Sequence, residues 1–392
     1  MTETSPIAGL HAATAELDPP LAVLDLAALR ANAADLVRRA ADIPVRVASK
    51  SVRCRAVLEE VLGADLTARG GFAGIMSYSL REAIWLVHRG ARDILLGYPS
   101  VDRAALAELA ADHTLLRSIT LMIDDVAQLD LIRAAVGTDR VRARVCLDVD
   151  ASLRIGPIHL GVRRSPVRTP EQAAALASEA LRRGFDVVGV MTYEAQIAGL
   201  PDTTAAVRLV KRASVVEIAK RRAKVLDAVR SVTGKLEIVN SGGTGSIEVS
   251  VADPDVTEVT AGSGLYVPTL FDHYRSFTPR PALYFATSVL RRPTPTIATV
   301  FAGGYTASGP AGPSRMPKPV WPSRLKLLGT EGAGEVQTPL SGAAELRIGD
   351  RVWFRHAKAG ELCERFDTVH LVEADGSRSS VPTYRGEGAC FG

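Results

Sequence analysis

The alternation of strands and helices constrains the fold of this chain more than any other feature. From about residue 20 to residue 266, short apolar runs that end in small or polar residues alternate with helical stretches rich in Ala, Leu and Arg. Eight runs are expected to be strands: 45–50, 65–71, 93–99, 118–124, 141–150, 186–193, 236–243 and 257–264. Strands that alternate with helices pair in parallel and are covered on both faces. Eight such units predict a closed (β/α)8 barrel, and an open doubly wound sheet is the alternative.

The composition changes after about residue 275. The stretches 279–304, 346–357 and 367–377 indicate strands joined by turns, with no good helix among them. We therefore predict an α/β barrel domain over residues 1–275 and a mostly β domain over residues 276–392. An apolar strand that begins at Leu21 precedes the barrel. It either pairs with the second domain or leads into the first helix.

Charge, cysteine content and hydropathy exclude several classes of protein. The net charge is +4 and the charges are dispersed, so nucleic acid is not expected as a partner. The cysteines, Cys54, Cys146, Cys363 and Cys390, form no CxxC motif, which excludes a disulfide framework. No apolar run approaches the ~20 residues that span a bilayer, and the N-terminal segment lacks the pattern of a signal peptide. We expect a cytoplasmic protein with no membrane partner.

The catalytic residues of such a barrel lie at the C-terminal ends of its strands. In the predicted strands these ends carry Lys50, Arg69, Asp148, Asp150 and Tyr193. Lys50 closes a strand whose other inward residues are apolar. A lysine amine that loses solvation is more easily deprotonated, as Schiff-base formation requires. The alternative is a lysine that extends to solvent from the strand end.

Two Gly-rich turns follow the predicted seventh and eighth strands. They are SGGTGS at 241–246 and GSG at 262–264. Backbone N–H groups of such turns form an anion site suited to one phosphate, and the ends of strands seven and eight are its usual place in this barrel. The motifs of nucleoside triphosphate and dinucleotide sites are missing here. A lysine beside a single-phosphate site is expected for pyridoxal 5′-phosphate.

The segments around these residues resemble those of the fold-type III pyridoxal-phosphate enzymes, which have an alanine-racemase-type N-terminal barrel followed by a β domain. RVASKSVR resembles their lysine motif. SGGTGS and TAGSGLYV resemble the phosphate and cofactor segments of the D-threonine aldolase and D-serine dehydratase branch. GVMTYEAQ resembles its strand-6 tyrosine segment, and LDVDASLRIG its strand-5 arginine motif. The resemblance extends from about residue 20 to residue 375, in the same order.

The resemblance implies a role for each matching residue. Lys50 would form the Schiff base and accept the substrate proton, Arg154 would contact the cofactor ring, and Tyr193 would line the pocket as a further catalytic residue. The remaining cofactor contacts would come from Asn240, Ser241, Gly242, Gly243, Thr244, Gly264 and Tyr266. Tyr266 is equally compatible with a place in the core.

One position departs from this branch, in which a His-x-Cys or His-x-Asp pair binds a divalent metal beside the cofactor. His356 matches the histidine, but Lys358 stands where the second ligand would be, and an ammonium repels a cation. Glu361 or Cys363 can substitute as a ligand, since Cys, His and Glu together suit zinc, with manganese as the other candidate. The alternative is that His356 and Lys358 bind the substrate carboxylate or act as acid and base without a metal.

The resemblance implies a pyridoxal-phosphate lyase acting on a small β-hydroxy D-amino acid, by aldol cleavage or by dehydration, with His356 facing the hydroxyl and a homodimer as the active form. The second hypothesis is an amino-acid racemase, for which Tyr266, Tyr284 or Tyr305 would supply the second base. A third is a non-catalytic pyridoxal-phosphate carrier, and a fourth is a barrel that binds no cofactor.

Overall fold

Eight parallel strands form a closed barrel in the computed structural model, which describes residues 6–136, 142–278 and 280–392. They are β2 (Val45–Ala48), β4 (Phe72–Ser77), β5 (Ile94–Leu96), β6 (Ile119–Ile123), β7 (Arg144–Asp148), β10 (Asp186–Thr192), β11 (Ile238–Ser241) and β12 (Glu258–Ala261). Strand β2 pairs with both β4 and β12, which closes the ring. The predicted barrel is confirmed, and the open sheet is excluded. Residue 141, where the predicted fifth strand begins, lies outside the described residues.

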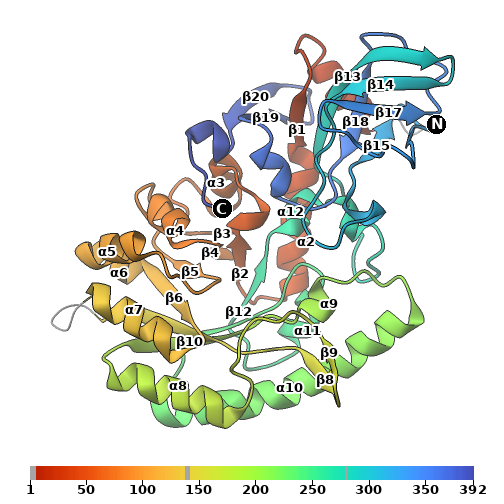
Figure 1. Ribbon diagram of the computed structural model, residues 1–392. Helices are drawn as coiled ribbons and strands as arrows, with labels where there is room; N and C mark the ends of the chain where they lie inside the picture. The colour runs from red at the N-terminus through yellow and green to blue at the C-terminus, as the bar shows by residue number, and fades with distance from the viewer. Residues whose placement is uncertain (1–5, 137–141, 279) are drawn as a thin grey trace.

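Helices cover the outside of the barrel (Figure 1). They are α2 (Leu26–Ala40), α3 (Arg55–Leu62), α4 (Leu80–Val87), α5 (Arg103–Ala111), α6 (His113–Ser118), α7 (Val126–Val136), α8 (Pro170–Arg182), α10 (Ala205–Thr233) and α11 (Ile247–Val251). Local sequence sets their limits, as α8 illustrates. Thr169 and Gln172 form a capping box at its start. Its buried residues Ala173, Leu176, Ala177 and Ala180 recur at helical spacing, so one face packs on the barrel.

The predicted second strand is wrong. The strand lies at β4, after residues 65–71, and only the two-residue β3 (Ala68–Arg69) falls within the predicted range. Gly70 and Gly71 have φ of +57° and +96°, so they form the turn that precedes β4. Arg69 therefore lies at the N-terminal end of this strand, away from the ends that carry catalytic residues.

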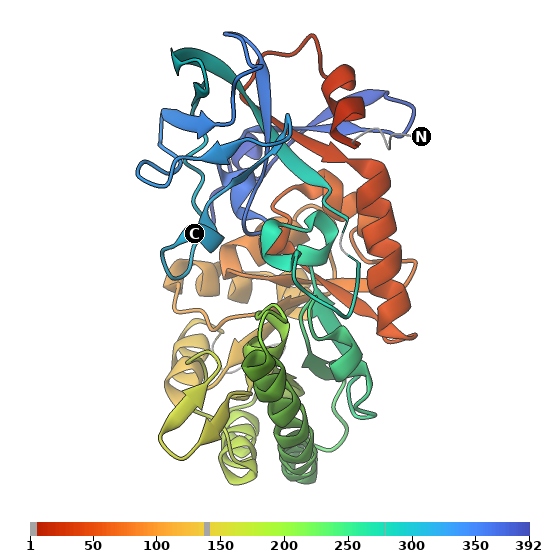
Figure 2. The ribbon, with the colours of Figure 1, turned by 90° about the vertical axis from the view of Figure 1, so that its right-hand side faces the viewer.

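A second sheet, of nine strands, contains the predicted C-terminal strands. Its members are β1 (Leu21–Asp25), β13 (Leu283–Thr294), β14 (Ile297–Phe301), β15 (Lys318–Trp321), β16 (Lys326–Leu327), β17 (Gln337–Ser341), β18 (Arg351–Arg355), β19 (Thr368–Val372) and β20 (Arg378–Pro382). The rings of Phe285 and Phe354 stack in its core with centroids 4.9 Å apart. Figure 2 shows this sheet above the barrel, with α10 in the lower part.

The N-terminal strand β1 belongs to this second sheet. It pairs antiparallel with β13 and parallel with β19. Short helices complete the chain at α1 (Pro6–Ala13), α9 (Ala195–Ala198) and α12 (Ser263–Tyr266). The question that the sequence left open is thereby answered, while the division at residues 275 and 276 stays a prediction. In the described part of the chain, no helix has the length and apolarity needed to cross a bilayer.

Candidate active site

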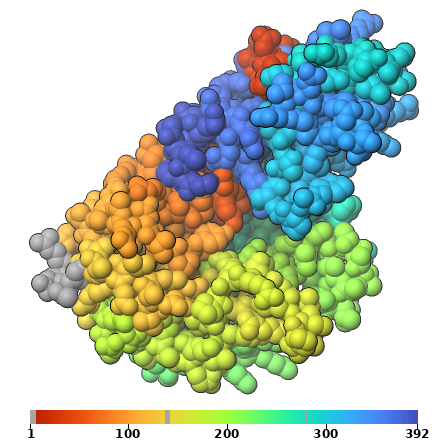
Figure 3. Space-filling view, viewed as in Figure 1, coloured from red at the N-terminus to blue at the C-terminus, as the bar shows by residue number. Residues whose placement is uncertain are grey.

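A cavity of about 420 Å³ lies at the C-terminal ends of the barrel strands. Its lining consists of Lys50, Tyr98, Pro99, Asp124, Asp148, Val162, Arg164 and Tyr193. We call it the Lys50 pocket. Figure 3 shows that the surface is hollowed where the blue C-terminal residues face the yellow and green residues of the barrel. Three of the predicted strand-end residues, Lys50, Asp148 and Tyr193, are thus brought together.

Lys50 lies in the short 3₁₀ segment Ser49–Ser51 that follows β2. Its Nζ donates a hydrogen bond to Tyr98 Oη at 2.5 Å. Arg53 Nε donates to the Lys50 carbonyl at 3.2 Å, which fixes the backbone. The lysine amine is therefore held at the barrel mouth with one phenol as its immediate partner.

Tyr98 is a site residue that the sequence prediction missed. Burial disfavours ionisation of its phenol, but the positive charges of Lys50, Arg164 and Lys358 outweigh burial and lower the pKa of Tyr98. The signal was present, because Tyr98 stands in the GYP segment directly after β5. A phenol that ionises more readily, hydrogen-bonded to an amine, is suited to exchanging a proton with it.

Arg164, which the sequence prediction did not name, lines the Lys50 pocket, whereas Arg154 is not among its lining residues. Its guanidinium lies 3.3 Å from Asp148 Oδ2 and donates to the Gly97 carbonyl at 2.9 Å. It also lies 5.4 Å from the ring centroid of Tyr193. Asp148 is buried, and burial raises its pKa to about 6, an effect that Arg164 opposes.

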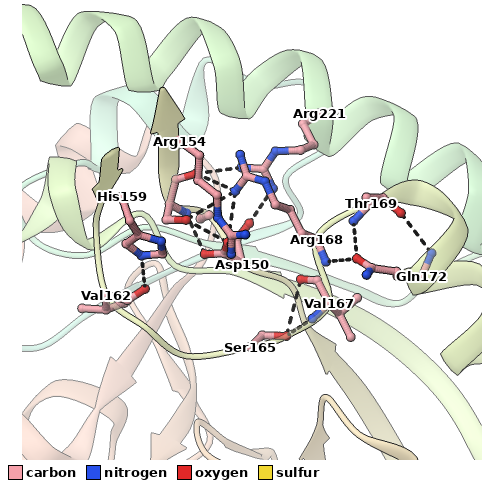
Figure 4. A network of polar contacts seen from close by, with 12 residues as sticks. Asp150, Arg154, His159, Val162, Ser165, Val167, Arg168, Thr169, Gln172 and Arg221 are labelled. Carbon is pink, nitrogen blue, oxygen red and sulfur yellow. Dashed lines mark hydrogen bonds and ion pairs between the residues drawn. The ribbon is translucent and has the colours of Figure 1, made fainter. Parts of the chain in front are cut away.

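The side chain of Arg154 lies beside Asp150, as Figure 4 shows. It lies on a hairpin of β8 (Leu153–Ile155) and β9 (Ile158–Leu160), where it pairs with Asp150 at 2.8 Å. Arg168 pairs with the same carboxylate at 3.0 Å. The hairpin lies between the end of β7 and the segment that carries Arg164 into the pocket. The ring contact that the resemblance implies for Arg154 stays a prediction.

The first Gly-rich turn, residues 241–246, is fixed by hydrogen bonds to Glu194. This buried carboxylate accepts from Ser241 Oγ and Gly242 N, each at 3.1 Å, and from Ser250 Oγ at 2.6 Å. Ser241 and Gly242 are thus occupied within the protein. Asn240 is occupied too, since its side chain donates to Glu258 and Thr260 inside the barrel.

The tip of the same turn keeps free donors. The backbone N–H groups of Thr244 and Gly245 have no acceptor among the described residues. Thr244 Oγ1 accepts from Gly264 N at 3.0 Å, so the two Gly-rich turns touch. A Cβ at Gly243 would lie 3.3 Å from the Tyr193 ring, which places the turn beside the pocket wall. Lysine, cavity and free N–H groups fit a cofactor that carries one phosphate.

Tyr266 does not reach this turn. Its side chain is fully buried, and its hydroxyl donates to the Val52 carbonyl at 3.0 Å. The structure therefore gives Tyr266 the core position that the sequence allowed as the alternative.

His356 lines a neighbouring cavity of about 250 Å³, together with Tyr305, Thr306, Ala307, Ala357, Lys358, Glu361, Leu362, Glu364 and Arg365. The imidazole is buried, and burial lowers its pKa to about 3. It is therefore neutral at physiological pH. Cys363 is buried in the core beside Tyr266, and burial raises the pKa of its thiol.

These residues do not fit a divalent metal. Among the described residues, no group of three or more His, Cys, Asp or Glu is placed to hold one. The carboxylate of Glu361 is taken by Ser308, whose N donates to it at 2.8 Å, and by Lys358 at 3.4 Å. Neither of the substitute ligands, Glu361 or Cys363, is free to join His356.

Known proteins with this architecture include D-amino-acid lyases. The alanine racemase N-terminal domain model matches residues 24–269. D-threonine aldolase of an Arthrobacter species is 26% identical over 308 residues, which span 76% of this chain and 75% of that protein. The structure of D-threonine aldolase from Filomicrobium marinum has a TM-score of 0.77 and 21% identity, covering 95% of this chain and 96% of that one. For D-threo-3-hydroxyaspartate dehydratase from a Delftia species the TM-score is 0.72 and the identity 21%, covering 94% and 97%.

Proposed function

Because this chain belongs to the alanine racemase N-terminal domain family, we propose that it is a pyridoxal-phosphate-dependent lyase. Its substrate would be a small β-hydroxy D-amino acid, cleaved in an aldol sense or dehydrated and deaminated. The observation that carries the proposal is that Tyr193 lines the same pocket as Lys50 and lies against the Gly-rich turn 241–246. The relatives that are D-threonine aldolases or a hydroxyaspartate dehydratase support the substrate class.

Each group in the pocket would have its own role in this reaction. Pyridoxal phosphate, when bound, supplies an electron-accepting ring conjugated to the substrate nitrogen. Lys50 would be the amine that holds the cofactor, with Tyr98 as its hydrogen-bond partner at 2.5 Å. In dehydration Lys50 would accept the Cα proton, and in aldol cleavage Cα would be protonated after the bond between Cα and Cβ breaks. The N–H groups of Thr244 and Gly245 would hold the phosphate, and Glu194 keeps their turn in place.

Arg164 and Tyr193 form the pocket wall around the cofactor. The guanidinium of Arg164 is anchored by Asp148, so it would present a fixed positive charge to the cofactor ring. His356 is neutral and buried at the neighbouring cavity, and in this proposal it would face the substrate hydroxyl. We also propose that the chain acts as a homodimer in the cytoplasm, which light scattering and cell fractionation test.

The first experiment is an absorbance spectrum of the purified protein with pyridoxal phosphate, before and after borohydride. A visible band that borohydride removes is expected. D-threonine, D-serine and D-threo-3-hydroxyaspartate are then assayed for aldehyde, keto acid and ammonia, and D- and L-alanine for inversion at Cα. Release of aldehyde or of keto acid with ammonia supports the lyase, and inversion alone identifies a racemase. A protein that takes up no cofactor would overturn the proposal.

A further inference from the structure

The loop that follows β18, residues 356–361, lies directly on the segment that carries Lys50. Gly360 has a φ of +80°, and a Cβ there would lie 2.0 Å from the Lys50 carbonyl oxygen. Backbone hydrogen bonds fix the start of the loop, since Thr269 N donates to the His356 carbonyl at 3.0 Å. A group on this loop therefore has a defined position relative to the Lys50 pocket.

Lys358 is the residue of this loop whose charge reaches the pocket. Its Nζ donates to Ser308 Oγ at 2.6 Å and lies 3.4 Å from Glu361 Oε1. Ser308 Oγ in turn donates to the same carboxylate oxygen. Lys358 is also one of the three cations that favour ionisation of Tyr98. The ammonium is thus held by two partners at the edge of the site.

His356 is a buried histidine whose ring nitrogens are unpaired within the described part of the chain, as they would be in a metal site that holds no metal. Its side chain is 2% exposed, and neither ring nitrogen has a geometrically sound hydrogen-bond partner among the described residues. A neutral imidazole of this kind is a good metal ligand. What is missing is an anionic donor beside it, because Lys358 stands two residues further along and Glu361 is bound to Lys358 and Ser308.

From this donor set we infer that the chain excludes divalent metal from His356, and that the ammonium of Lys358, held by Glu361 and Ser308, is the fixed positive charge which the loop presents to the site. A divalent cation beside His356 would be repelled by the ammonium and would find the nearby carboxylate already paired. The inference about metal exclusion concerns binding alone. Its catalytic part rests on the proposed function.

Metal content tests the inference without an activity assay. The protein is incubated with Zn²⁺ or Mn²⁺, desalted and analysed by inductively coupled plasma mass spectrometry. We expect less than about 0.1 metal ion per chain in the wild type, and about one in Lys358→Cys and Lys358→Asp, which restore an anionic donor two residues from His356. The double variant Lys358→Cys with His356→Ala should lose the ion again, and Lys326→Cys, an exposed lysine on β16, is the matched control.

Either of two results would overturn the inference. One is a stoichiometric ion in the wild type that His356→Ala removes. The other is a folded Lys358→Cys protein, checked by circular dichroism, that binds no more metal than Lys326→Cys. If no assay detects lyase activity, the proposed function is wrong, but the result on metal binding is unaffected.

The charge of Lys358 is tested in the active enzyme. Turnover by the wild type should change less than twofold in EDTA. Lys358→Met should lower kcat/KM at least tenfold with the cofactor absorbance band intact, and Lys358→Arg should recover part of the loss. A wild type that EDTA inactivates, or a Lys358→Met enzyme with full activity, contradicts this part.

Discussion

The two sides of the active site are built differently. The barrel side supplies Lys50, Asp148 and Tyr193 from the ends of parallel strands, where the closed ring fixes each position. The C-terminal side is the neighbouring cavity, where His356 and Lys358 lie on the loop that follows β18 of the other sheet. The comparison teaches that strand ends hold their functional groups through the closed ring, whereas the loop depends on its own ion pair between Lys358 and Glu361.

Removing Lys50 should have the largest effect, because it disables the barrel side of the site. Lys50→Ala should lower turnover by at least about 1000-fold, because no other amine in the Lys50 pocket can take its place. The borohydride-sensitive absorbance band should disappear as well. Lys318→Ala, an exposed lysine on β15, should keep both. An unchanged band in Lys50→Ala would mean that the cofactor is attached elsewhere.

Glu82 tests the junction of the two sides. It is fully buried, faces the hydroxyls of Ser49 and Tyr384, and accepts from Tyr78 N at 2.8 Å. Burial raises its pKa from 4.5 to about 7. The folded protein therefore holds the proton more tightly than the unfolded chain. The stability that this gives is complete below pH 4.5 and is lost as the pH rises through about 7.

Glu82→Gln should remove this pH dependence, because glutamine resembles the protonated acid at every pH. The wild type should lose about 3 kcal/mol of unfolding free energy relative to Glu82→Gln between pH 4.5 and pH 8. Urea unfolding at the two pH values measures this difference. Equal pH dependence in both proteins would show that Glu82 ionises normally.

The two arginines near β7 give a matched pair with an intermediate effect. Arg164→Met should weaken cofactor binding by about 10–100-fold, the value of a charge-assisted hydrogen bond. Arg154→Met should change the affinity for the cofactor less than twofold, since the guanidinium of Arg154 is paired with Asp150 at the hairpin. Cofactor titration followed by absorbance compares them. The opposite order would restore Arg154 to the role that the sequence first indicated.

The smallest effect is expected on the loop side, from Glu361→Gln. Lys358 and Glu361 are both partly exposed, so their ion pair contributes at most about 1 kcal/mol to stability. We expect a small shift in Tm and a fall in kcat/KM of less than about fivefold, as Lys358 loses one of its two partners. Glu373→Gln, which breaks a surface pair with Arg30, is the control. A large loss of stability would show that this pair supports the loop itself.

The barrel and its lysine were predictable because their signals are local. Apolar runs followed by helical periodicity define the strands, and Lys50 is recognised by its place at the end of one. Gly70 and Gly71 misled the prediction for the second strand, since a glycine pair marks a turn without saying on which side the strand lies. Arg164 was missed because the hairpin of β8 and β9 lies between it and the end of β7.

The remaining features depend on contacts between distant segments. Tyr266 is bound to the Val52 carbonyl, and Glu194 is bound to Ser241 and Gly242, which lie about 50 residues further along the chain. No periodicity reports such pairs. Hydrogen bonds of this kind become visible only when the barrel closes and brings neighbouring strand ends together.

The position of β1 has a consequence for synthesis of the chain. Leu21 pairs with Ala286 and Ala22 with Val369, so the second neighbour of β1 is among the last segments to leave the ribosome. At about 5–20 residues per second, β1 waits roughly 20 to 70 s for it. Strand β1 is synthesised early, but it is paired on both edges only near the end of synthesis. During that time, the edge of β1 that later pairs with β19 keeps unpaired backbone groups, which are exposed to chaperones and to other nascent chains.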